Sequence, residues 1–140
     1  MIWILYLMIY SVMTREAFIK KLKREDYSYE IEGDKIVVTY GGNVDLRSLT
    51  SLPPGVEFEN RGDVDLRSLT SISPGVEFRN RGVVLLNVLT SIPPGVVFRN
   101  EGDVYLGFLI GRWFDEWKGN IEGIDSKRLL NKMIKQGMFI

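Results

Sequence analysis

The side chains best suited to chemistry in this sequence are carboxylates and arginines that recur at a spacing of twenty residues. They are Asp45, Arg47, Glu57, Asp65, Arg67 and Glu77. Two carboxylates can hydrolyse a glycosidic bond when their pKa values differ and a cleft separates them. Here each residue has a partner of its own type at the next step of a regular ladder, which indicates no cleft. We therefore predict no catalytic residues and no enzyme activity.

The composition excludes most familiar active sites. The chain contains no cysteine and no histidine, which removes disulfides, thiolate metal sites, cysteine nucleophiles and the commonest general base. Its 18 basic residues balance 18 acidic residues, so no overall field attracts nucleic acid or an anionic membrane. We expect no cofactor, no metal site and no nucleic-acid partner. A length of 140 residues suits a single domain.

Residues 43–102 consist of three copies of a twenty-residue repeat, joined without insertions. The copies read NVDLRSLTSLPPGVEFENRG, DVDLRSLTSISPGVEFRNRG and VVLLNVLTSIPPGVVFRNEG, and a fourth begins as DVYLGFL. A constant spacing lets each residue lie above its counterpart in stacked rungs about 4.8 Å apart. The repeat predicts a mainly β protein, a short β-solenoid whose rungs occupy residues 43–106.

Several columns of the repeat are apolar in every copy and are predicted to form the core. In the first copy they are Val44, Leu46, Leu49, Leu52, Val56 and Phe58. Their spacing predicts two short strands per rung, at residues 44–46 and 56–58 in the first rung.

Turn residues are predicted at two corners of each rung. We expect Pro54-Gly55 and its equivalents to form one corner, with a positive φ at the glycine as a type II turn requires. Gly62 and its equivalents are expected to form the other corner in a similar way. The column of Asn60, Asn80 and Asn100 is expected to be an amide ladder that satisfies turn backbone, with ligand binding as the alternative.

The segment before the repeat is predicted to cap one end of the solenoid. Apolar residues at helical spacing predict a helix over residues 14–25 with Thr14 as its N-cap. Alternating residues at 27–32 and 35–40 predict a β-hairpin around Gly33-Asp34. We expect this helix-hairpin cap to occupy residues 14–42.

The segment after the repeat is predicted to cap the opposite end. A helix is expected over residues 125–136, capped by Asp125 or Ser126, with Gly137 just past its end. Its apolar stripe is Leu129, Leu130, Met133 and Ile134, and the aromatic residues Trp113, Phe114 and Trp117 precede it. We expect residues 107–140 to form this helical cap.

The segment LTSLPPGV resembles the Leu-Thr-Ser-Leu-Pro segment of short bacterial leucine-rich repeats. The likeness covers about sixty residues and implies a leucine-rich-repeat-like solenoid. The asparagine that caps the turn in that family is missing here, and a second apolar pair, Val56 and Phe58, is present instead. A straight solenoid is therefore expected in place of a curved horseshoe. The whole layout is also similar to uncharacterised repeat proteins of bacteria and their phages, a resemblance that implies no activity.

The outward columns change along the stack from polar to apolar, for example from Asp45 and Asp65 to Leu85 and Tyr105. We predict two sets of partner-binding residues. The polar set is Asp45, Arg47, Asp65 and Arg67, and the apolar set is Leu85, Val88, Val97 and Tyr105. An exposed apolar set requires a cover, which we expect the C-terminal segment to supply, with a partner or a second copy as the alternative.

The first residues, from Ile2 to Met13, are almost wholly apolar. A helix of about 12 residues is roughly 18 Å long and too short to cross a bilayer, although it could attach the chain to a membrane. The competing interpretations are a natural start at Met13 and a strand that covers one end of the solenoid.

These observations favour a non-enzymatic protein-interaction or structural module that uses the solenoid surface, with a protein partner or self-association. The alternatives are a carbohydrate-binding or carbohydrate-active solenoid and a membrane-associated protein that uses residues 2–13. We expect a cytoplasmic location.

Overall fold

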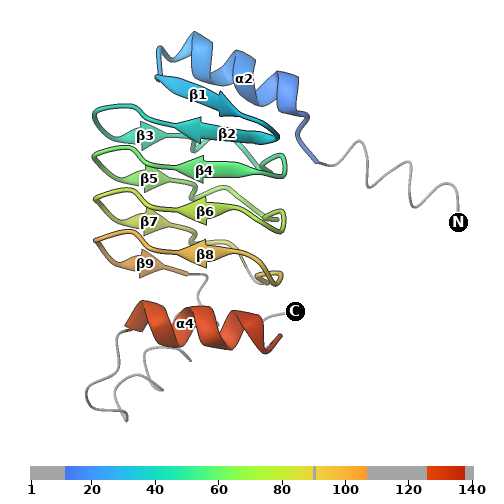
Figure 1. Cartoon of the computed structure of the whole chain (residues 1–140), viewed down its shortest axis with the longest axis vertical. Helices are drawn as coiled ribbons and strands as arrows, with labels where there is room; N and C mark the ends of the chain where they lie inside the picture. The colour runs from blue at the N-terminus through green and yellow to red at the C-terminus, as the bar shows by residue number, and fades with distance from the viewer. Residues whose placement is uncertain (1–11, 90, 107–125, 138–140) are drawn as a thin grey trace, which may run out of the picture.

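The computed structural model describes residues 12–89, 91–106 and 126–137. Within these ranges the chain winds into a mainly β solenoid with a helix at each end, α2 (Arg15–Arg24) and α4 (Ser126–Lys135) (Figure 1). Sheet A contains, in spatial order, β1 (Tyr29–Glu32), β2 (Lys35–Val38), β4 (Val56–Phe58), β6 (Glu77–Phe78) and β8 (Val97–Phe98). Sheet B contains β3 (Val44–Asp45), β5 (Val64–Asp65), β7 (Val84–Leu85) and β9 (Val104–Tyr105). The predicted fold class is confirmed.

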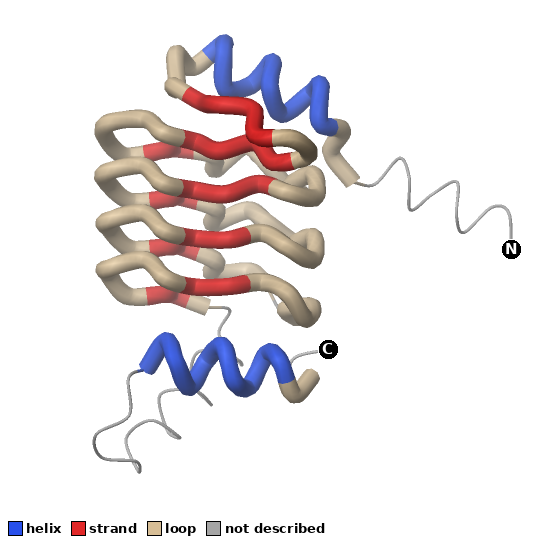
Figure 2. Tube along the Cα trace, in the orientation of Figure 1, coloured by secondary structure: helices blue, strands red, loops and turns tan. Residues whose placement is uncertain are grey.

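The register of the sheets follows the twenty-residue repeat directly. Val44 pairs with Val64 in the next rung, and Phe58 pairs with Phe78, always in parallel. Figure 2 shows the short strands stacked rung above rung. The first strand of the rung ends at Asp45, one residue earlier than predicted. The chain turns immediately afterwards, because the N–H of Leu49 donates to the carbonyl oxygen of Leu46 at 3.0 Å. Each rung therefore contributes one short strand to each sheet.

The core lies between the two sheets and consists of the predicted apolar columns, all of them buried. Its largest side chains form a stack of three parallel rings. The centroids of Phe58 and Phe78 are 5.2 Å apart, and those of Phe78 and Phe98 are 5.1 Å apart. Because the same side chain repeats at the rung spacing, each phenylalanine ring packs against an identical ring in the neighbouring rung.

The two predicted glycine corners differ in their physical cause. Gly55, Gly75 and Gly95 have φ values of 78°, 84° and 91°, as the prediction for the Pro-Gly corner requires. Gly62 has no positive φ, so the same prediction for the second corner was wrong. A Cβ on Gly62 would lie 2.1 Å from Oδ1 of Asn43 and 2.8 Å from the backbone of Gly42. Close approach of successive rungs, rather than a left-handed backbone, requires glycine there.

The asparagine column satisfies the backbone of the second corner, as predicted. The amide nitrogen of Asn80 lies 3.0 Å from the carbonyl oxygen of Gly62, 3.3 Å from that of Gly82 and 3.2 Å from that of Val83. Asn60 and Asn100 make the equivalent contacts in their own rungs. Each amide thus ties its own rung to the preceding one.

The predicted helix-hairpin cap closes the N-terminal end. The Thr14 hydroxyl accepts a hydrogen bond from the N–H of Ala17 at 3.1 Å and begins α2, which buries Phe18 and Leu22. Strands β1 and β2 form the antiparallel hairpin, and β2 pairs in parallel with β4 of the first full rung. Residues 1–11, for which a strand or a membrane attachment was considered, lie outside the described residues. Within the described ranges, no helix has the length and apolar character needed to cross a membrane.

Helix α4 closes the C-terminal end of sheet A, and its predicted apolar stripe is buried. The side chain of Asn131 takes the place of a further strand. Its Nδ2 donates to the carbonyl oxygen of Phe98 at 2.9 Å, and its Oδ1 accepts from the N–H of Phe98 at 3.0 Å. Lys127 donates to the carbonyl oxygen of Asn100. Gly137 lies just past the end of α4, as predicted, and has a positive φ of 75°. The predicted aromatic residues Trp113, Phe114 and Trp117 lie outside the described residues.

Candidate functional site

The polar set predicted on the outer face of sheet B forms a continuous ladder of ion pairs. Nη2 of Arg47 lies 2.8 Å from Oδ2 of Asp45, and Nη2 of Arg67 lies 3.0 Å from Oδ2 of Asp65. A longer contact of 3.7 Å joins Arg47 to Asp65 in the next rung. The hydrogen bond from Arg47 holds the pKa of Asp45 below its ordinary value. The structure therefore brings all four predicted residues together.

These aspartates also fix the backbone. The N–H of Arg47 donates to Oδ1 of Asp45 at 3.1 Å, and the N–H of Arg67 donates to Oδ1 of Asp65 at 3.2 Å. Each carboxylate thereby holds the turn that follows its strand, in the manner of an Asx turn. The side chains of Arg47, Arg67 and Asp45 remain about half exposed, whereas that of Asp65 is mostly covered.

The four residues of the apolar set do not form one patch. Leu85 lies in β7 and aligns with Tyr105 in β9, and both point outward from sheet B. Val88 follows β7 and is exposed. Val97 lies in β8 of sheet A, where it pairs with Glu77. The apolar character at this end of the solenoid is therefore divided between two faces.

The outer face of sheet A carries a second ion-pair ladder. Nε of Arg79 lies 3.1 Å from Oε1 of Glu57, and its Nη2 lies 2.9 Å from Oε1 of Glu77. Arg99, one rung further along, is 3.5 Å from the same oxygen of Glu77. Burial of the carboxyl, followed by the neighbouring Glu77 carboxyl, raises the pKa of Glu57 above its ordinary value.

Sequence reasoning placed Glu57 and Glu77 on a regular ladder but missed the arginines that pair with them. The available signal was the column of Glu59, Arg79 and Arg99, two positions after the glutamate column. Because side chains two apart in a strand share a face, this column had to lie beside the glutamates.

A shallow hollow of about 400 Å³ lies beside the Pro-Gly corner of the first rung. It is lined by Val12, Met13, Thr14, Arg15, Asp34, Pro53, Pro54 and Gly55. The Arg15 guanidinium donates to the backbone carbonyl oxygen of Asp34 at 2.8 Å. Among the residues that the structure describes, no three acidic side chains lie close enough together to hold a metal ion.

Comparison of the chain with protein-family models, with curated proteins and with solved structures finds no match.

Proposed function

We propose that this protein is a non-enzymatic interaction or structural module that docks a protein through the outer faces of its solenoid. The observation that carries the proposal is the pair of regular, in-register ion-pair ladders, one on each sheet. Such ladders present charged groups at a fixed spacing on a rigid scaffold, and charge patterns of this kind give specificity to protein docking. The cytoplasmic location expected from the sequence is part of the same proposal, and fractionation of the source cells tests it.

The contacts of Arg79 support docking over glycoside hydrolysis. Hydrolysis requires one protonated and one ionised carboxyl on opposite sides of a sugar. Glu57 and Glu77 instead lie side by side in adjacent strands and share Arg79. A glycan-binding screen tests the carbohydrate alternative, and binding that is lost in Glu57→Gln would favour it.

Affinity capture with matched variants of the full chain tests the proposal. Arg47→Ala with Arg67→Ala removes two exposed cations of sheet B, and Glu59→Ala with Arg99→Ala removes two charges of sheet A. Lys20→Ala with Lys23→Ala removes two exposed cations of α2 and is the control. We expect the natural chain and the control variant to capture the same protein, and at least one of the two face variants to fail to capture it. Equal retention by all variants would exclude both faces as the docking surface.

A further inference from the structure

The outer face of sheet A has a charge gradient along the solenoid axis. Near the N-terminal end it carries four glutamates and one lysine. Toward the C-terminal end it carries one glutamate and two arginines. The N-terminal set is Glu30, Glu32, Lys35, Glu57 and Glu59. The C-terminal set is Glu77, Arg79 and Arg99. Helix α4, which continues sheet A through Asn131, has no acidic residue and extends the basic end.

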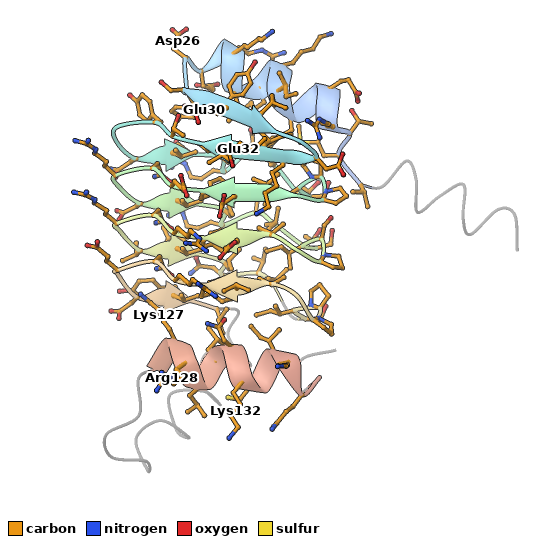
Figure 3. All side chains as sticks on the ribbon, viewed as in Figure 1. Asp26, Glu30, Glu32, Lys127, Arg128 and Lys132 are labelled. Atoms are coloured by element: carbon orange, nitrogen blue, oxygen red, sulfur yellow. The ribbon has the colours of Figure 1, made fainter. Side chains whose placement is uncertain are left out.

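Four exposed charges, two at each end of this face, have no ion pair among the described residues, whereas those in the middle are paired. Glu30 and Glu32 are exposed, and neither takes part in an ion pair among the described residues. On α4 the same holds for Arg128 and Lys132, which are exposed and, being four residues apart, lie on one side of the helix. Figure 3 shows the glutamates on β1 and these cations on α4 at opposite ends of the molecule.

We propose that a second copy of this chain covers the outer face of sheet A in an antiparallel arrangement. Glu30 and Glu32 of each copy then lie against Arg128 and Lys132 of the other. A two-fold axis along the strand direction produces this contact twice in one closed dimer. The inference rests on the proposed docking role and assigns the partner for sheet A.

Helix α2 decides between this arrangement and end-to-end stacking. Its exposed charges are three cations, Lys20, Lys23 and Arg24, and one carboxylate, Glu16, so the helix surface is basic on balance. Stacking along the solenoid axis would place these cations against the cations of α4, and like charges brought together are unfavourable. The antiparallel arrangement keeps the two basic helices apart while the acidic end of one copy meets the basic end of the other.

Sedimentation velocity of the full chain at several protein concentrations tests the dimer. Because the contacts are exposed ion pairs, we expect the dissociation constant to rise at least about tenfold between 0.05 M and 0.5 M salt. Association through the apolar residues 2–13 would have the opposite salt dependence. A chain that is monomeric in low salt, or that associates more strongly in high salt, overturns the proposal.

Charge reversal identifies the contact. The double variant Glu30→Lys with Glu32→Lys should make β1 repel α4 of the other copy. The double variant Arg128→Glu with Lys132→Glu should make α4 repel β1 of the other copy. Each double variant alone is therefore expected to raise the dissociation constant about tenfold or more. An equimolar mixture of the two variants restores attraction at both contacts, so a 1:1 dimer should form again.

The matched control is Lys20→Glu with Lys23→Glu on α2, which changes the net charge as much as the α4 variant and should leave the dimer intact. Glu30→Gln with Glu32→Gln replaces the first variant if charge reversal unfolds the chain, and should weaken the dimer less. Failure of the mixture to associate overturns the assigned contact, and oligomers that grow beyond two copies overturn the antiparallel arrangement. A monomeric chain that still captures another protein overturns self-association alone and leaves the docking role standing.

Discussion

The inside and the outside of each rung follow different rules. Inside, the same or closely similar residues recur in every rung, as in the ring stack of Phe58, Phe78 and Phe98. Outside, one column runs from Asp65 to Leu85 and Tyr105 in consecutive rungs. A buried side chain must match the shape of its neighbours, whereas an exposed one has a small effect on stability. The interior therefore specifies the fold and leaves the outer faces free to specify a partner.

The largest loss of stability is expected for a change in the middle of the ring stack. Phe78→Ala removes a fully buried ring and should lower the free energy of unfolding by about 3–5 kcal/mol. Urea denaturation measures this loss. Phe78→Leu, which keeps most of the apolar volume, is the control and should lose less. A loss below about 1 kcal/mol for the alanine variant would contradict the contrast between inside and outside.

The asparagine column is the polar part of the interior, and its removal should be the next most damaging change. Asn80→Leu removes the amide donor that Gly62, Gly82 and Val83 share, although each carbonyl oxygen keeps a backbone N–H donor. We expect a loss of about 2 kcal/mol, at roughly 1 kcal/mol for each amide proton that loses its hydrogen bond. Asn80→Asp should lose more at pH 7, where a carboxylate would repel those oxygens, and less at pH 3, where the protonated acid can donate one hydrogen bond. An unchanged denaturation midpoint for both variants would show that the column does not join the rungs.

The difference between the two environments also explains how much of the molecule could be predicted from the sequence. The inner columns were predicted because each copy of the repeat reports the same environment, so three copies agree on which residues are buried. The strands, the Pro-Gly corner, the hairpin and both helices followed from local patterns.

The remaining features depend on contacts between segments that no local pattern reports. The hydrogen bonds of Asn131 to Phe98 span 33 residues, and nothing in the sequence of the C-terminal helix marks Asn131 as a substitute for a strand. The role of Gly62 was assigned wrongly because close approach and a left-handed backbone both select glycine. The apolar set was treated as one patch because the sequence shows which residues point outward, but not on which of two faces.

The C-terminal edge of sheet A is intermediate between the interior and the outer faces. There a single side chain, that of Asn131, forms hydrogen bonds with the backbone of the last strand, β8. Asn131→Ala should lower the free energy of unfolding by about 1–2 kcal/mol. It should also speed hydrogen exchange at the N–H of Phe98 more than at the N–H groups of β4. Lys135→Ala, at an exposed residue of the same helix, is the control for helix propensity. Equal exchange in both variants would mean that α4 packs on β8 without this contact.

The two outer faces should respond to pH in opposite directions. The folded chain raises the pKa of Glu57 above 4.5, so it binds this proton more tightly than the unfolded chain and loses stability as the pH rises through that window. Glu57→Gln should therefore compare more favourably with the natural chain at pH 7 than at pH 4.

Asp45 provides the opposite case. Its pKa is lowered below 3.8, so its contribution is present at neutral pH and is lost as the pH falls through the folded pKa. Asp45→Asn should compare less favourably with the natural chain at pH 7 than at pH 3. Thermal denaturation across this pH range measures both differences, and the same sign for both variants would contradict the assigned environments.

The smallest effect is expected for the exposed cations of sheet B. The Arg67 side chain is 47% exposed, and an ion pair in such a position contributes at most about 1 kcal/mol, because water competes for both charges. Arg67→Ala should change the free energy of unfolding by about 0.5 kcal/mol or less, while Asp65→Ala should lose more because Asp65 also accepts from the N–H of Arg67. A larger loss for Arg67 than for Asp65 would mean that the arginines, rather than the turn-holding aspartates, support the rungs. The ladder would then be part of the fold, and it could not vary freely to suit a partner.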